Sequence, residues 1–241
     1  MTQSHEHDIT NRMLRSLPPV TLERILPALE PLNTVRRQVL NRMDRPIEHL
    51  YFINRGLVSL VMTMQDGRTA EIATVGIEGV THPNAFLTGM GKTITDTVVQ
   101  IPGTAFRIRS DILRHEMAMD DALREAMLKC ARFAIRQLAH NAACNRLHSI
   151  KERCCRWLLM AHDSALCETF PLTHDFLAMV LGVQRGGVSI AARSLQKAGL
   201  IVYTRGRVTI RNRSGLEDRA CECYAATRAE LENLSGAPKR R

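Results

Sequence analysis

The sequence lacks the motifs on which several classes of enzyme depend. It contains no paired-histidine metal motif, no Gly-x-Ser-x-Gly and no glycine-rich phosphate loop. Because these patterns position the metal, nucleophile or phosphate of many enzymes, we do not expect an enzyme. No run approaches the roughly 18 apolar residues of a membrane span, and the polar first ten residues do not resemble a signal peptide. We therefore expect a cytoplasmic protein with no membrane partner.

Cysteines are absent before Cys130, and none of the seven forms a Cys-x-x-Cys pair. An odd number of cysteines in a chain without an export signal argues against a disulfide framework. Cys221 and Cys223 together with Cys154 and Cys155 could gather a soft metal, but thiols in helical runs more often serve as buried packing residues. We therefore expect no metal and no cofactor, while an unknown small ligand remains open.

Acidic residues are absent between Arg185 and Arg213, and the wider segment from Arg146 to Arg213 holds eleven Lys and Arg residues against four Asp and Glu residues. The formal net charge of the whole chain is +9. A surface of one sign favours a polyanionic partner, because Lys and Arg contacts to phosphates release counterions. A solvated basic face is the alternative reading of the charge alone.

Residues 18–109 are rich in short strand patterns separated by turn signals. We predict a helix over residues 22–29, strands over 50–53, 57–62, 69–75, 94–101 and 104–108, and turns at Arg55-Gly56, Asp66-Gly67 and Pro102-Gly103. Many short strands at this spacing predict a small antiparallel barrel or roll.

The next stretch contains neither glycine nor proline between Ser110 and Pro171, which predicts mainly helix. Within it, apolar residues recur at alternating spacings of four and three, which aligns them along one side of a helix: Leu123, Met127, Cys130, Ala134 and Leu138. Such a stripe packs either on its own domain or on the helix of a second copy. We expect it to form the dimer contact.

A helix-turn-helix pattern begins at Thr173, a natural N-cap. Gly182 stands where the tight turn between two helices requires positive φ, and a second helix is predicted over residues 184–197, closed by Gly199. Two strand patterns joined by Thr204–Arg207 then predict a wing. Helix, turn and helix form the geometry that lays a second helix in the major groove of DNA.

Arg185 lies in the first turn of that second helix, where it could read a guanine with its guanidinium group. Ser189 is expected to contact a base or a phosphate, whereas Arg193 and Lys197 are expected to meet the phosphate backbone. The complete set of expected DNA contacts is Thr173, Gln184, Arg185, Gly186, Ser189, Arg193, Lys197, Arg205 and Arg207.

The segments 170–173, 181–183, 197–201 and 205–207 read Phe-Pro-Leu-Thr, Leu-Gly-Val, Lys-Ala-Gly-Leu-Ile and Arg-Gly-Arg. With them, nearly the whole chain resembles the Crp/Fnr (catabolite activator and FNR) family of bacterial transcription regulators. The resemblance implies an α+β fold with an N-terminal antiparallel β-roll like the cyclic-nucleotide-binding jelly roll, a long dimerisation helix and a C-terminal winged helix-turn-helix. It also implies a homodimer on an inverted-repeat operator, and RNA polymerase as a further partner.

The domain boundaries that follow are 1–109 for a sensory β-roll, 110–145 for the dimerisation helix, 146–220 for the DNA-binding domain and 221–241 for a helical tail. The recognition helix departs from the family at two positions. Gly186 stands where a base-contacting Glu is common, and Ile190 stands at a family arginine position. The operator sequence of other members cannot be transferred to this chain.

The resemblance also suggests an effector site in the roll, at Gly76, Glu78 and Gly79. Its arginine for a cyclic phosphate is missing, Asp96 would repel the phosphate and Lys92 is the only nearby cation. We therefore do not expect cyclic AMP. The lack of N-terminal cysteines argues against the iron-sulfur cluster of the FNR branch.

Two other functions remain open from the residues alone. One is a metal- or cysteine-dependent enzyme, and the other is a basic protein-interaction module with a vestigial DNA-binding domain. His49, His82 and His115 are each a conceivable axial ligand for haem, although a lone histidine is more often a surface or packing residue.

Overall fold

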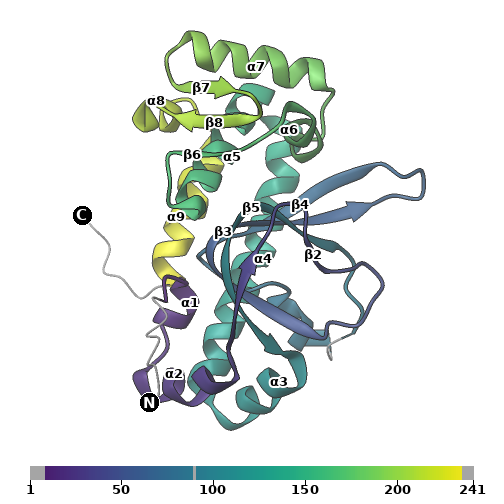
Figure 1. Cartoon of the computed structure of the whole chain (residues 1–241), viewed down its shortest axis with the longest axis vertical. Coiled ribbons are helices and arrows are strands. Elements are labelled where there is room, and N and C mark those ends of the chain that lie inside the picture. The colour runs from purple at the N-terminus through teal and green to yellow at the C-terminus, as the bar shows by residue number, and fades with distance from the viewer. Residues whose placement is uncertain (1–8, 89–90, 235–241) are drawn as a thin grey trace.

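The computed structural model describes residues 9–88 and 91–234 and has an α+β fold, in which a long helix, α4, runs between a strand-rich half and a helical half (Figure 1). The strand-rich half contains α1 (Arg12–Arg15), α2 (Pro19–Ile25), η1 (Leu26–Ala28), β1 (Glu30–Thr34), β2 (Val39–Asn41), β3 (His49–Thr63), β4 (Thr69–Val75), η2 (Pro83–Thr88) and β5 (Asp96–Arg109). The remaining elements are α3 (Ser110–Met119), α4 (Asp121–Leu147), α5 (Ile150–Ala165), β6 (Thr169–Pro171), α6 (His174–Leu181), α7 (Arg185–Lys197), β7 (Ile201–Thr204), β8 (Arg207–Ile210), α8 (Arg213–Glu217) and α9 (Glu222–Leu234).

The N-terminal sheet is antiparallel, with the strand order β1-β5-β3-β4 and with β2 paired to β5. The predicted hairpin at Asp66-Gly67 joins β3 to β4. There Gly67 has φ +81°, and the Arg68 N–H donates to Asp66 Oδ1 at 3.0 Å. The expected antiparallel roll is confirmed.

Two predicted turns in this sheet are wrong. Arg55-Gly56 and Pro102-Gly103 lie inside the continuous strands β3 and β5, which pair with each other and change register at these positions. A Cβ on Gly56 would lie 2.4 Å from the Ile101 carbonyl oxygen, and one on Gly103 would lie 2.1 Å from the Arg55 carbonyl oxygen. The two glycines therefore allow the backbones of β3 and β5 to approach closely at a bulge. In the sequence alone, glycines with this role look the same as glycines in turns.

The helical stretch after Ser110 is broken at Asp120, which the sequence analysis did not predict. Asp120 has extended backbone angles, and its Oδ1 accepts the N–H groups of Ala122 at 2.8 Å and Leu123 at 3.0 Å. This side chain therefore caps a new helix, α4, of 27 residues.

The structure places the predicted dimer stripe differently from expectation. Leu123, Met127 and Cys130 are at most 4% exposed and belong to a core shared with the roll. Ala134 is half-buried and Leu138 is 39% exposed. The first three residues therefore pack within their own chain and are unavailable to a partner, because helical spacing does not reveal which neighbour covers a stripe.

The C-terminal half is built around α5, which carries the chain's single tryptophan. Trp157 and Leu158 are buried, and α5 begins with a capping box between Ser149 and Glu152. After the winged region, α9 returns along α4, where Arg136 and Glu230 form an ion pair at 3.0 Å. Across residues 9–88 and 91–234, no helix is long and apolar enough to cross a membrane.

Candidate nucleic-acid interface

Helices α6 and α7 form the predicted helix-turn-helix. Thr173 caps α6, and its Oγ1 accepts the Phe176 N–H at 3.2 Å. Gly182 ends α6 with φ +61°, and α7 begins at Arg185. The inward face of α7 is apolar and buried at Val188, Ala191, Ala192 and Leu195. This packing fixes which side of α7 faces solvent.

The outward face of α7 carries most of the expected DNA contacts. Gln184, Arg185, Gly186, Arg193 and Lys197 are exposed. Ser189 is half-buried, and its Oγ lies 3.1 Å from Nδ1 of His174, so its hydroxyl already has a partner within the domain. The exposed cationic side chains on this face are therefore more available to a ligand than the hydroxyl of Ser189.

Ile190 is the residue that sequence reasoning did not propose as a contact. It is 71% exposed on the solvent face of α7. An exposed, branched apolar side chain on a recognition helix suits the methyl group of thymine. Its position at a family arginine site was visible in the sequence, but its exposure was not.

Arg185 forms an ion pair with Asp175 of α6, with Nε 3.3 Å from Oδ1. The two side chains are 69% and 71% exposed, so solvent screens the pair and its contribution to stability is small. Arg185 can therefore exchange this carboxylate for a base edge or phosphate at little cost.

The wing is the hairpin of β7 and β8, with β6 paired along the outer side of β8. Its tip consists of Arg205 and Gly206, both with positive φ (47° and 74°), as in the turns that favour tight hairpins. The Leu172 N–H donates to the Gly206 carbonyl oxygen at 2.8 Å, which ties the tip to the start of α6. Arg205 and Arg207 are exposed, and Arg207 also donates to the Thr169 carbonyl oxygen at 3.5 Å.

Residues 152–219 match the family model of the Crp-like helix-turn-helix domain. These residues form a Crp-like helix-turn-helix domain. The protein is therefore a DNA-binding transcription regulator of the Crp/Fnr type, and regulators of this type are typically not enzymes.

Solved structures share the fold of this regulator at low sequence identity. FixK2 from Bradyrhizobium japonicum is 17% identical with a TM-score of 0.67, and the match covers 80% of this chain and 98% of FixK2. A CRP-family transcriptional regulator from Thermus thermophilus, TTHB099, is 21% identical (TM-score 0.62; 78% and 96% covered). The c-di-GMP responsive regulator CLP of Xanthomonas campestris is 15% identical (TM-score 0.62; 80% and 99% covered). No curated protein matches the chain.

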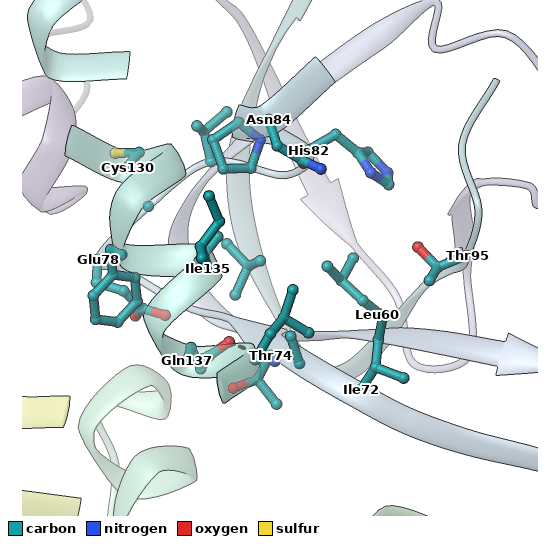
Figure 2. Close-up of a pocket in the computed structure, with 18 of the residues that line it drawn as sticks. Leu60, Ile72, Thr74, Glu78, His82, Asn84, Thr95, Cys130, Ile135 and Gln137 are labelled. Atoms are coloured by element: carbon teal, nitrogen blue, oxygen red, sulfur yellow. Dashed lines mark hydrogen bonds between the residues drawn. The ribbon is translucent and has the colours of Figure 1, made fainter. Parts of the chain in front are cut away.

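A cavity of about 90 Å³ lies between the roll and α4 (Figure 2). Of the predicted effector residues, Glu78 and Gly79 line it, whereas Gly76 lies beside it and donates its N–H to Glu78 Oε1 at 2.8 Å. Burial raises the pKa of Glu78. Most of the remaining lining is apolar, including Leu60, Ile72, Val80, Phe133 and Leu138.

The described lining of this cavity contains no lysine or arginine. His82 also lines it, but burial lowers its pKa to about 4, so the ring is neutral near pH 7. His82 Nε2 pairs with Thr97 Oγ1 at 2.9 Å. A phosphate group would therefore find no cationic partner among these residues.

Asp96 has a different role from the one expected. Its Oδ1 accepts the Met43 N–H at 2.8 Å, and the residue is not part of the described cavity lining. Lys92 is exposed in an isolated bridge with Pro46, also outside that lining. The missing cation, and not repulsion by Asp96, therefore disfavours a cyclic phosphate in this cavity.

A contact between the roll and α5 links the strand-rich half to the helical half. The Trp157 Nε1–H donates to Glu71 Oε1 at 3.1 Å, and the Ser59 hydroxyl donates to the other carboxylate oxygen of Glu71. Burial raises the pKa of Glu71 to about 7, although both hydrogen bonds oppose the shift. The sequence offered no signal for this pair, because its residues are 86 positions apart.

Proposed function

We propose that this regulator binds an inverted-repeat operator as a homodimer, with α7 of each copy in a major groove. The observation that carries the proposal is the exposed face of α7, which presents Arg185, Arg193 and Lys197 within a segment free of acids. In this arrangement Arg185 reads a guanine, and Arg193, Lys197 and the wing arginines contact phosphates. The other expected contacts are Thr173, Gln184, Gly186 and Ser189, of which Gln184 and Gly186 are exposed and Thr173 and Ser189 are half-buried.

We assign the dimer contact to an exposed apolar face of α4 that keeps Leu138 of the predicted stripe and adds Leu128 and Ile135. Among its large apolar residues, Leu128, Ile135 and Leu138 are 46%, 55% and 39% exposed. Leu128 and Ile135 are seven residues apart, and Leu138 follows three later, which is the spacing of a coiled-coil seam. Two copies of α4 packed through this face would cover side chains that a single chain leaves in water.

The cavity in the roll is the proposed effector site, and its lining favours a small, uncharged, mostly apolar ligand. Ile135 and Leu138 line this cavity and also belong to the exposed face of α4. A ligand that moves them would therefore alter the proposed dimer contact directly. Ligand binding in the roll would in this way be coupled, through the α4 dimer contact, to the spacing of the two α7 helices.

Selection of operators from random duplex DNA tests the proposal. We expect an inverted repeat whose half-sites lie about one helical turn, roughly 10 base pairs, apart. Ile135→Asp should yield a monomer in sedimentation experiments and should bind a full operator no better than a half-site. Leu147→Asp, at an apolar residue of α4 that is 76% exposed and outside the assigned face, is the control. A dimeric Ile135→Asp protein, or a selected site without symmetry, would contradict this assignment.

The resemblance to the family is the sole basis for expecting RNA polymerase as a further partner.

Calorimetry with cyclic AMP tests the effector assignment separately. We expect no binding at micromolar concentrations, and a measurable micromolar affinity would show that the cavity accepts a phosphate after all.

A further inference from the structure

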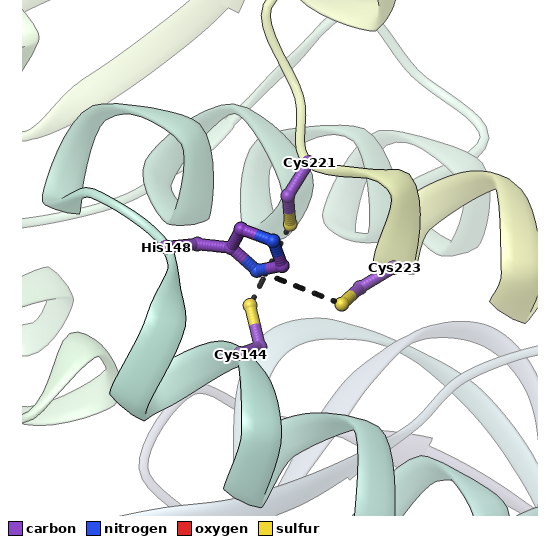
Figure 3. Close-up of side chains that lie close together, drawn as sticks. All are labelled: Cys144, His148, Cys221 and Cys223. Carbon is purple, nitrogen blue, oxygen red and sulfur yellow. Dashed lines mark hydrogen bonds between the residues drawn. The ribbon is translucent and has the colours of Figure 1, made fainter.

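Three of the seven cysteines gather with one histidine where α4 meets the start of α9 (Figure 3). Cys144 and His148 lie four residues apart at the end of α4, so they share one side of the helix. Cys221 and Cys223 flank the first residue of α9. The four potential ligand atoms lie within 4.8 Å of one another.

The alternative grouping of Cys221 and Cys223 with Cys154 and Cys155, considered from the sequence, does not occur in the structure. Cys154 and Cys155 are fully buried in the apolar core of the winged domain, where burial raises the pKa of both thiols. Cys144 and His148 take their place in the cluster. The helix supplies these two ligands, and the tail supplies the other two from more than 70 residues away.

Two distances within the cluster match the edges of a tetrahedral metal site. Cys144 Sγ lies 3.5 Å from Cys221 Sγ, and Cys223 Sγ lies 3.8 Å from His148 Nδ1. With Zn–S bonds of about 2.3 Å and Zn–N bonds of about 2.0 Å, the edges of a tetrahedron measure roughly 3.5–3.8 Å. A single ion can thus reach all four atoms after small side-chain adjustments.

The other nitrogen of His148 has a carboxylate partner of the kind that metal-binding histidines commonly have. His148 Nε2 lies 3.0 Å from Glu222 Oε2, which leaves Nδ1 directed toward the cysteines (Figure 3). Histidines that bind metals commonly donate their remaining N–H to a carboxylate, which fixes the ring and its tautomer. Glu222 stands between the two cysteines of the tail, so the same segment supplies two ligands and the supporting acid.

Charge around the cluster also favours bound thiolates. Zn²⁺ with three thiolates and a neutral imidazole carries one net negative charge. Arg153 and Arg156 are each only 8% exposed, and within the described residues neither forms an ion pair with a carboxylate. Arg156 Nε is also buried without a hydrogen-bond partner.

We propose that Cys144, His148, Cys221 and Cys223 bind one Zn²⁺ ion, which joins the end of α4 to the start of α9. Three sulfurs and one nitrogen with no open position are the donor set of a structural zinc site. On binding, each thiol gives its proton to solvent and its sulfur lone pair to the metal, so no oxidant or reductant is needed.

The location of the site suggests what the ion would stabilise. His148 is the residue at which α4 ends, and Ser149 caps α5, so the ligands span the corner between the long helix and the DNA-binding domain. Arg153 crosses the same corner, donating to Asn145 Oδ1 at 2.7 Å and to the Leu181 carbonyl oxygen. A bound ion would therefore hold the angle of the DNA-binding domain on α4. The metal assignment itself does not depend on DNA binding.

The experiment is a metal titration of the reduced full-length protein, followed by elemental analysis. We expect about one zinc per chain, and a cobalt-substituted protein with the visible absorption of a tetrahedral thiolate site. Cys221→Ser and His148→Ala should lose the metal and the cobalt spectrum. Cys167→Ser is the matched control, because Cys167 is half-buried outside the cluster. It should retain both.

Glu222→Gln keeps the test decisive if the ligand variants fold poorly, since this side chain is 80% exposed. It should still bind one zinc, with an affinity about 10–100-fold lower. A chelator should lower the melting temperature of the wild-type protein but not that of Cys221→Ser. Failure of the reduced protein to bind zinc, equal loss in Cys167→Ser, or recovery of iron and sulfide or of a Cys144–Cys221 disulfide in place of zinc would overturn the proposal. None of these results depends on operator binding.

Discussion

The exposed face of α7 carries Arg185, Arg193 and Lys197, whereas the cavity in the β-roll is lined mostly by apolar groups and by the neutral ring of His82. Salt screens interactions of the first surface because its charges lie in water. Protons, in contrast, act on the roll, where burial shifts the pKa values of Glu71, Glu78 and His82. One half of the regulator should therefore respond to ionic strength and the other to pH.

The largest expected effect is a loss of binding to every duplex after charge reversal on the recognition surface. Changing Arg193, Arg205 and Arg207 together to Glu should weaken binding on the order of 100-fold or more, because attraction to phosphates becomes repulsion. The slope of log affinity against log salt should become shallower by about 0.9 for each lost phosphate contact. Fluorescence anisotropy with specific and random duplexes measures both quantities.

A control with the same net charge separates local contacts from total charge. Arg36, Arg42 and Arg68 are exposed in the roll, far along the chain from α7. Changing these three to Glu should affect affinity much less. Equal losses in the two triple variants would mean that net charge, and not the recognition surface, governs binding.

Removal of Arg185 should have a smaller and more selective effect. Arg185→Ala is expected to cost about 1–3 kcal/mol on the selected operator and to leave binding to random DNA almost unchanged. Asp175→Asn frees Arg185 from its ion pair and should not weaken the operator complex. Equal losses on both kinds of DNA after Arg185→Ala would reassign this residue to a phosphate.

The stability of the folded protein should depend on pH through Glu71 of the roll. The pKa of Glu71 is raised to about 7 in the folded protein, so its protonated form stabilises the fold at low pH, and this contribution is lost as pH rises through about 7. The fluorescence of Trp157, the single tryptophan, should change over the same range because its indole N–H donates to Glu71.

In Glu71→Gln the pH dependence of both signals should disappear, since an amide does not ionise. Asp66→Asn, which removes an exposed carboxylate of the β3–β4 hairpin, should retain it. If Glu71→Gln kept the transition near pH 7, another group would cause the pH dependence, and the assignment of this transition to Glu71 would be wrong.

The smallest expected effect concerns the apolar residue on the recognition helix. Ile190→Ala should cost less than about 1 kcal/mol on an operator with a thymine in reach of this side chain. Replacement of that thymine by uracil, which lacks the methyl group, should make the wild-type and variant proteins equal. A difference that persists with uracil at every operator position would place the Ile190 contact on something other than a thymine methyl group.

Prediction from sequence succeeded best in the winged helix-turn-helix. Thr173, Gly182 and Gly199 each mark a helix end through the backbone or side chain of a single residue, and all three act there as expected. Prediction of the roll was less accurate. Gly56 and Gly103 suggested turns because the sequence cannot show that the two glycines face each other across β3 and β5.

The amino-acid sequence by itself determined the order of the elements, the caps of α6 and α7 and the sign of the charge on the DNA-binding segment. Those properties depend on residues a few positions apart, whose backbone preferences and charges act locally. Tertiary structure alone decided which stripe of α4 stays exposed, which thiols join His148 and where Glu71 meets Trp157. Each of these depends on packing between distant segments, which no short stretch of sequence encodes.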